Sequence, residues 1–331
     1  MQKSAQSDSD KWSRYWSDGR IAACMADAGG SYGDQLGEQW RRWFEQLPEC
    51  ARVLDLATGN GALVHLALAS GNGSRLRLVG VDYAAIEPWR QLPAALSEQK
   101  RIRFYGHTNI ERMPFAAGMF DAVVSQYGAE YAETGASIAE AVRVLARGGC
   151  LRWVCHHRDS TIYRNTCSEI EHARFVLEQA QPDLLLAALL QRQIEAGRFI
   201  EQSHQRTAST PQRQALNAAL QACVQRLRAA TPASEFLDMV LQNLAYIYQH
   251  REQHTPELVL QKVAEVRVEM EVFLGRMQAL VSSALDNDKV NTILARLAAH
   301  GMHAGEVEMV HKRNGDIIGV AISASKSTQA D

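Results

Sequence analysis

The sequence lacks the features of a membrane-spanning, disulfide-linked or nucleic-acid-binding protein. No run reaches the roughly 18 apolar residues of a transmembrane helix, and the polar N-terminal residues have no apolar segment of a secretory signal. The six cysteines form no Cys-x-x-Cys pair, which favours buried thiols over a disulfide frame or zinc cluster. Because 35 Lys and Arg face 37 Asp and Glu, no positive field is present to bind a phosphate backbone. We therefore expect a cytoplasmic protein with no nucleic-acid partner and no membrane span.

The chain has 331 residues, more than one average domain of roughly 100–200 residues, and it contains two regions with different patterns of apolar residues. From about 50 to 158, short apolar, β-branched runs alternate with helical stretches. The runs are ARVLDLATGNG, RLRLVGVDY, RIRFYGHT, FDAVVSQYG and CLRWVCHH. This alternation predicts βαβ units and a parallel sheet that is buried on both faces.

From about 160 to 288 the pattern is helical, with apolar residues at three- and four-residue intervals. One helix face would carry Val263, Val266, Met270, Phe273 or Leu274, and Met277. A Thr cap before Pro predicts helix starts at Thr210-Pro211, Thr231-Pro232 and Thr255-Pro256, within four or five helices. After a further short helix, two strand runs joined at Gly315-Asp316 predict a hairpin.

A Gly-rich turn, Asp55 to Gly61, closes the first strand and opens a helix. Such a turn lets a ligand approach backbone amides. A dinucleotide fingerprint needs a third glycine where Val64 stands, and Asp55 would repel a pyrophosphate. A ligand with a cationic amino-acid end, such as S-adenosylmethionine, suits this carboxylate better. The second strand ends at Asp82, which can accept ribose hydroxyls.

Four motifs, in this order, resemble the class I S-adenosylmethionine-dependent methyltransferases, closest to the ubiquinone- and menaquinone-biosynthesis branch. They are VLDLATGNG, GVDY, NIERMPFAAGMFDAVVSQYG and EAVRVLARGGCL. The resemblance covers about 50–158 and 289–325. It implies an α/β, Rossmann-like, doubly wound, mostly parallel seven-stranded sheet with an antiparallel last strand, to which the helical pattern adds an all-helical insertion. We therefore expect an N-terminal helical segment 1–49 that packs on or caps the active site, a methyltransferase domain 50–158 with 289–325, and the insertion 159–288.

The resemblance also implies the cofactor, S-adenosylmethionine, which leaves as S-adenosylhomocysteine. Asp55 and the backbone of Ala57, Thr58, Gly59, Asn60 and Gly61 would hold its methionine part. Asp82 would hold the ribose, with Tyr83 beside the adenine. Asn109, where the family usually has Asp, would accept from the adenine amino group through its amide oxygen, and Ile110 would contact the ring. Gln126 and Tyr127 would line the methionine and methyl end.

Methyl transfer from a sulfonium is an in-line displacement, so placement of the acceptor supplies much of the catalysis. A general base is needed where the acceptor is protonated. The candidates for acid–base or positioning roles are His156, His157, Tyr127 and Glu130. Strand neighbours point opposite ways, so we expect one of the two histidines to face the site and the other to face outward. Each candidate also has a structural alternative to a catalytic role. The histidines could be held by the following helix, and Glu130, like Tyr131, could be a residue that starts a helix.

Aromatic residues gather near the N-terminus, where Trp12, Tyr15 and Trp16 share a helix face. This face either packs on the main domain or forms a lid over the active site. His250 and His254 stand four apart on an expected helix, but no third ligand is near, so we predict no metal.

The leading functional hypothesis is methylation of a small-molecule acceptor, with the insertion as a cap over the acceptor site or a homodimer interface. One alternative is a protein side-chain methyltransferase that docks its substrate on the insertion. The other is a non-catalytic cofactor-binding partner subunit.

Overall fold

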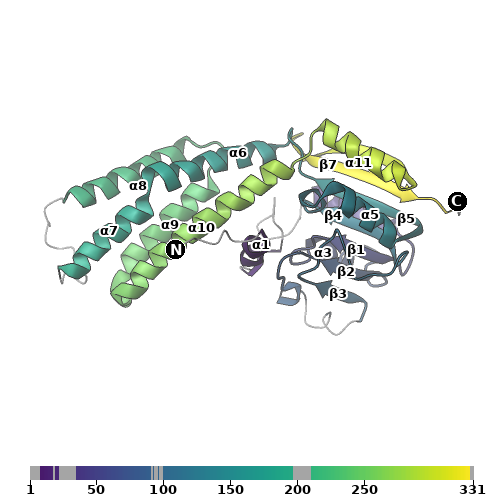
Figure 1. The fold of residues 1–331 in the computed structure, drawn as a ribbon, viewed down its shortest axis with the longest axis horizontal. Coiled ribbons are helices and arrows are strands. Elements are labelled where there is room, and N and C mark those ends of the chain that lie inside the picture. Colours follow the sequence, from purple (N-terminus) through teal and green to yellow (C-terminus); the bar gives the residue numbers. More distant parts are fainter. Residues whose placement is uncertain are drawn as a thin grey trace. The chain divides into compact units, whose positions relative to one another are not determined.

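Figure 1 shows the chain as a computed structural model with two compact units. The described residues are 8–17, 19–21, 35–90, 92, 96, 100–196 and 210–328, so Cys24 and parts of the expected N-terminal segment and insertion lie outside them. The first unit comprises Met1–Arg164 and Leu280–Asp331, and the second comprises Asn165–Ala279. We call them the sheet unit and the helical unit.

The sheet unit contains a seven-stranded sheet in the order β3-β2-β1-β4-β5-β7-β6. Its strands are β1 (Arg52–Leu56), β2 (Arg77–Val81), β3 (Ile102–Tyr105), β4 (Phe120–Gln126), β5 (Leu145–Cys155), β6 (Met302–His311) and β7 (Ile317–Lys326). Strands β1 to β5 pair in parallel, and β7 lies antiparallel between β5 and β6. The predicted doubly wound sheet with an antiparallel last strand is confirmed.

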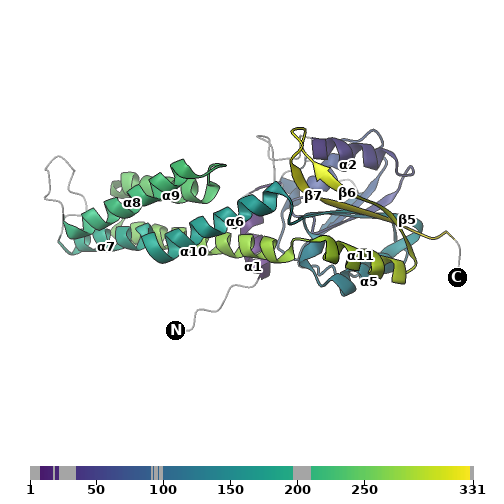
Figure 2. The ribbon, with the colours of Figure 1, turned by 90° about the horizontal axis from the view of Figure 1, so that it is seen from above.

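Apolar side chains cover both faces of this sheet, as its β-branched runs predicted. Figure 2 shows α5 (Thr134–Val144) and α11 (Asn287–Ala299) on one face and α2 (Gln35–Glu45) on the other. The first core includes Leu54, Phe120, Val123, Ile138, Trp153 and Ile293. The second includes Leu36, Trp40, Phe44, Val53, Leu63 and Ile318, with Leu63 from α3 (Ala62–Leu68).

The hairpin between β6 and β7 turns where the sequence predicted it. Gly315 has φ +87°, a conformation that glycine adopts without strain, and the Lys312 amide donates to the Asp316 carbonyl over 2.8 Å. The hairpin places β7, the last strand in the sequence, between β5 and β6, so that β6 forms the edge of the sheet.

The strand order reverses at β1, which pairs with β2 on one side and with β4 on the other. In open parallel sheets, ligands bind at the carboxyl ends of the strands beside such a reversal. The Gly-rich turn after β1 and the segment after β4 therefore lie where a ligand site is expected.

The helical unit continues from α6 (Thr161–Arg174), which begins in the sheet unit. A π-helical segment, η3 (Phe175–Ala180), and α7 (Pro182–Glu195), α8 (Pro211–Ala229), α9 (Glu235–His250) and α10 (Pro256–Ser283) follow. The described part of the unit is helical throughout, apart from short connections.

Two of the three predicted helix starts are found. Thr210 caps α8 by accepting from the Arg213 amide over 3.3 Å, and Thr255 precedes α10. The start predicted at Thr231-Pro232 is wrong, because α9 begins at Glu235 with Ser234 as its cap. Ser234 accepts from the Leu237 amide, and so satisfies a donor that the Thr-Pro pair does not reach.

The helical unit has an apolar core of its own, and the predicted face of α10 contributes to it. Val263, Val266 and Met270 are buried beside Phe236 and Leu237 of α9. Asp183 is also buried, and the Arg267 guanidinium donates to it over 3.0 Å. A buried carboxylate requires such a partner, so this ion pair links α7 to α10.

Candidate functional site

The Gly-rich turn leaves β1 through a series of left-handed residues. Ala57 and Gly59 both have φ +52° and Gly61 has φ +87°, after which α3 begins at Ala62. Ala57 is strained here, since a Cβ in this region costs about 1–2 kcal/mol. A Cβ on Gly128 would collide with that of Ala57, so the turns after β1 and β4 approach each other closely. The turn's backbone is thus curved as a ligand-binding loop requires.

Asp55 is 3% exposed at the end of β1, where the Thr58 hydroxyl donates to its Oδ2 over 2.6 Å. Burial raises the pKa of Asp55 to about 8; the Thr58 hydrogen bond opposes this shift and the charge of Asp82 adds to it. A cationic group beside Asp55 would relieve the cost of its buried charge. The residue therefore fits the ammonium end of an amino-acid ligand.

Asp82 ends β2 beside this turn and accepts two backbone hydrogen bonds. The Gly59 amide donates to Oδ2 and the Ala84 amide to Oδ1, each over 2.8 Å. Burial raises the pKa of Asp82 to about 6, against the lowering effect of both bonds. Asp82 thus links the Gly-rich turn to the loop after β2, the place predicted for a ribose.

Asn60 has a role that its sequence position does not reveal. Its side chain is 1% exposed and its Nδ2 donates to the carbonyls of Trp16 and Arg20, over 2.9 and 2.7 Å. Its Oδ1 accepts from the Glu87 amide over 3.1 Å. The Asn60 side chain therefore ties the end of α1 (Asp8–Ser17) to the Gly-rich turn, and only the Asn60 backbone is left for the predicted ligand contact.

The aromatic face of α1 packs on the predicted cofactor loops. Tyr15 and Trp16 are buried against Ala84, and the Trp16 ring lies 2.5 Å from where a Cβ on Gly59 would stand. The packing role expected of this face is therefore observed. Gly59 is required by Trp16 as well as by the curvature of the turn, a cause that sequence reasoning missed.

The residues expected around the adenine differ in exposure. Tyr83 is 55% exposed, whereas Ile110 is buried in the sheet core. Asn109 is exposed, and its Oδ1 accepts from the Glu111 amide over 2.8 Å. The Asn109 oxygen predicted to accept from the adenine thus already accepts one backbone hydrogen bond, and one of its lone pairs remains.

Gln126 and Tyr127 leave β4 in different directions. Gln126 accepts a hydrogen bond from the indole Nε1 of Trp40, a residue of α2. Tyr127 has φ +54°, its hydroxyl donates to the Ile318 carbonyl over 3.1 Å, and its ring stacks on His156 at 4.4 Å. The strained backbone of Tyr127 places its ring against the histidine after β5.

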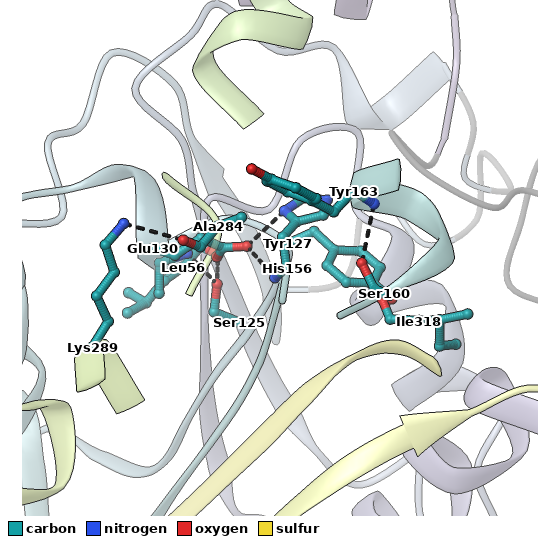
Figure 3. Close-up of polar contacts among 11 residues, drawn as sticks. Leu56, Ser125, Tyr127, Glu130, His156, Ser160, Tyr163, Ala284, Lys289 and Ile318 are labelled. Atoms are coloured by element: carbon teal, nitrogen blue, oxygen red, sulfur yellow. Dashed lines mark hydrogen bonds and ion pairs between the residues drawn. The ribbon is translucent and has the colours of Figure 1, made fainter. Parts of the chain in front are cut away.

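Glu130 and His156 form a buried pair at the carboxyl ends of β4 and β5 (Figure 3). Their side chains are 0% and 1% exposed. Glu130 Oε1 accepts from the His156 amide and lies 2.8 Å from His156 Nδ1. A carboxylate can only accept, so Nδ1 carries the proton and the lone pair resides on Nε2. Neighbouring Cys155 is a neutral thiol, because burial and then the Glu130 charge raise its pKa.

His157 lies in a different environment from its neighbour. It is 2% exposed, its Nδ1 accepts from the Asp159 amide over 3.2 Å, and its backbone bridges to Leu285. Neither histidine faces solvent, since both are buried, and the two have different neighbours. The structure brings together Tyr127, Glu130 and His156 and places His157 in a separate set of contacts.

Two other expectations concern histidines and thiols. His250 ends α9 and His254 follows the short helix η4 (Arg251–Gln253), so the expected single helix carrying both is wrong. Among the described residues, no three His, Cys, Asp or Glu gather as metal ligands.

Five described cysteines are free; Cys155 and Cys223 are buried as expected, while Cys50 is exposed. Within the described chain, no helix combines the length and the apolar character that crossing a membrane demands.

Comparison with known proteins identifies one region. Residues 53–149 match the family described as a methyltransferase domain. They run from β1 through the Gly-rich turn, Asp82 and Glu130 to the start of β5. No curated protein matches the chain.

Solved structures of methyltransferases are similar to this chain at low identity. The 1,6-didemethyltoxoflavin-N1-methyltransferase of Burkholderia thailandensis has 11% identity and a TM-score of 0.44, over 95% of this chain and 84% of that one. A SAM dependent methyltransferase from Aquifex aeolicus has 10% identity and a TM-score of 0.41, over 87% and 88%. A Haloferax volcanii complex of a methyltransferase with its Trm112 activator has 22% identity and a TM-score of 0.29; 38% of this chain spans 62% of that one.

Proposed function

We propose that this chain, which carries a class I S-adenosylmethionine-dependent methyltransferase domain, methylates an O–H or N–H group of a small molecule. The observation that carries the proposal is the buried Glu130–His156 pair at the rim of the cofactor site. The near-neutral charge of the chain agrees with a small-molecule acceptor.

The cofactor contacts follow from the residues at the carboxyl ends of β1 and β2. Asp55 pairs with the ammonium group of the methionine part, and the turn from Ala57 to Gly61 supplies backbone contacts. Asp82 accepts from the ribose hydroxyls while it holds the Gly59 and Ala84 amides. Two buried carboxylates in one site suit a ligand that brings both a cation and hydroxyl donors.

The Glu130–His156 pair moves the proton that methyl transfer releases. S-adenosylmethionine supplies a methyl group on a sulfonium, whose sulfur keeps the electrons of the broken C–S bond. As a lone pair of the acceptor oxygen or nitrogen forms the new bond to carbon, the acceptor proton passes to His156 Nε2. Glu130 holds Nδ1–H, orients the ring and stabilises the resulting imidazolium.

This role is tested with His156→Gln and Glu130→Gln, against His303→Gln on the exposed part of β6 as control. We expect the two site variants to lower kcat about 10²–10⁴-fold, the range for lost general-base catalysis. Binding of S-adenosylhomocysteine, measured by calorimetry, should stay unchanged. Wild-type kcat in His156→Gln would contradict the proposed base.

The acceptor class is tested by transfer of label from S-adenosyl-[methyl-³H]methionine into a cell extract divided into protein and deproteinised fractions. Label in the small-molecule fraction supports the proposal. Label in protein alone would favour the protein side-chain methyltransferase, and cofactor binding without any transfer would favour a partner subunit.

We propose that the helical unit supplies acceptor specificity, because the chain leaves the sheet unit through α6, soon after β5 and His156, and returns to it through α10. Removing Asn165–Ala279 should abolish turnover and spare S-adenosylhomocysteine binding. Turnover by the shortened chain would refute this role.

A further inference from the structure

Four rings form a continuous aromatic cluster across the carboxyl ends of the strands. Trp12 of α1 meets Tyr131 edge to face at 5.8 Å, and Tyr131 meets His156 edge to face at 6.0 Å. Tyr127 stacks on the same imidazole at 4.4 Å. We call Trp12, Tyr131, His156 and Tyr127 the aromatic cluster. It connects α1 to the proposed base.

Trp16 connects the aromatic cluster to the Gly-rich turn. Trp12 stacks on Trp16 at 6.2 Å, and the Trp16 ring covers Gly59. Hydrogen bonds hold α1 in this place: the Ser9 hydroxyl donates to the Tyr83 carbonyl and the Ala85 amide donates to the Ser13 hydroxyl. Trp12 is therefore positioned by the same loops that carry Asp55 and Asp82.

The rings of the cluster differ in burial. Tyr127 and His156 are buried, whereas Trp12 and Tyr131 are half-buried and so keep part of their surface open. Open aromatic surface beside a reactive centre is suited to stacking against a flat ligand.

A second, independent observation comes from Glu130. Its Oε2 is buried and accepts no N–H or O–H hydrogen bond from the described residues, although Oε1 accepts twice from His156; the Cys155 thiol, a weak donor, is the other group bonded to this carboxylate. An unmatched buried carboxylate oxygen is costly, and a ligand that donates a hydrogen bond removes that cost. It also disfavours an anionic ligand group at the same place.

We propose that the acceptor is a planar aromatic or heteroaromatic molecule bearing a neutral or cationic O–H or N–H group, held by Trp12 and Tyr131 beside Glu130 and His156. This inference rests on the proposed methyltransferase function and specifies its acceptor. The rings orient the plane of the acceptor, Glu130 Oε2 accepts from its donor group, and His156 takes the proton from the methylated atom.

The test compares flat probes with saturated ones on the full chain. The flat probes are 7-hydroxycoumarin and benzimidazole; their counterparts are cyclohexanol and cyclohexylamine, with 2-naphthoic acid as a flat anion. Each is titrated into protein saturated with S-adenosylhomocysteine, and each is then assayed for ³H-methyl transfer. We expect the flat O–H or N–H probes to bind at least about tenfold more tightly than the saturated probes and the anion.

Two substitutions locate the flat probes. Trp12→Leu and Tyr131→Leu keep an apolar side chain and lose the ring, so each should weaken flat-probe binding about three- to tenfold, the amount that one stacking contact contributes. Tyr131→Phe keeps the ring and should bind the flat probes as tightly as the wild type does. Affinity for S-adenosylhomocysteine and for the saturated probes should not change, which separates lost stacking from displacement of α1.

The outcomes distinguish this inference from the function on which it rests. Failure to bind S-adenosylhomocysteine would refute the proposed function itself. Binding of S-adenosylhomocysteine with equal affinity for flat and saturated probes, or with no flat probe bound, would overturn the inference alone. Undiminished flat-probe binding in both leucine variants would also overturn it.

Discussion

Binding of S-adenosylhomocysteine should become tighter as pH rises, because Asp55 must be ionised to pair with the ammonium group. With a pKa of about 8, its ionised fraction rises about ninefold between pH 6 and pH 7. The dissociation constant should fall by the same factor. Asp82, with a pKa of about 6, adds less than about twofold over this interval.

Isothermal titration measures both the affinity and the protons exchanged. At pH 7 the ligand-free protein holds about 0.9 proton on Asp55, so binding should release nearly one proton per ligand. Titrations in phosphate, imidazole and Tris separate this proton from the binding enthalpy, because these buffers differ in ionisation enthalpy.

Asp55→Asn is the matched variant, since its amide keeps the shape and does not titrate. We expect weaker binding that varies less than about twofold between pH 6 and pH 7, with the remainder due to Asp82. An affinity independent of pH in the wild type, with no proton released, would refute the reasoning. So would a ninefold change that persists in Asp55→Asn.

Three further predictions concern stability. Burial raises the pKa of Asp55 from an unfolded value near 4 to about 8, so the contribution of this carboxyl to the stability of the ligand-free fold is full below about pH 4 and is lost as pH rises through about 8. Asp55→Asn carries no charge and should therefore raise Tm, measured by calorimetry, more at pH 8 than at pH 5. Gly59→Ala should lower Tm, because it meets the Trp16 ring at φ +52°, and Trp16→Ala added to it should restore part of the loss; additive effects would contradict the contact. Arg267→Ala should lower the free energy of unfolding by about 3–5 kcal/mol in urea, since Asp183 stays buried without that guanidinium, whereas Glu271→Ala, at its exposed partner, should change it by less than about 1 kcal/mol.

The sheet was predictable because its strands are written as separate apolar runs. Val53, Leu54 and Leu56 are buried between two layers of helices, so β1 has no polar face to obscure its pattern. The same holds for Val123 and Val124 of β4. The doubly wound arrangement with an antiparallel last strand followed from the motif resemblance, since apolar runs alone do not specify which strands pair.

The contacts that assemble the site were less accessible to sequence reasoning. Asn60 binds carbonyl groups about forty residues earlier in the chain, and no local pattern marks such a partner. The start of α9 was misplaced because Thr231-Pro232 satisfies a local rule, whereas the Ser234 hydroxyl caps the helix and also donates to Glu169, far away in the chain. Local propensity identifies candidates, and tertiary partners choose among them.

The site itself shows the same limit. Glu130 and His156 were both candidates, but their sequence separation of 26 residues concealed that one carboxylate oxygen holds two donors of one histidine. Alternation along a strand predicted that one of the two histidines would face the site and the other outward, without indicating which one. Both histidines follow Cys155, the last residue of β5, and the structure buries both of them.

The position of β7 between β5 and β6 has a consequence for synthesis on the ribosome. Cys155 pairs with Val320, so β5 keeps an open edge while the whole helical unit is being made. That unit is continuous in sequence and has its own core, so it can fold in the meantime. The nascent chain thus carries an unpaired strand edge until β7 (Ile317–Lys326) emerges, and a product that stalls before β7 would expose that edge to aggregation.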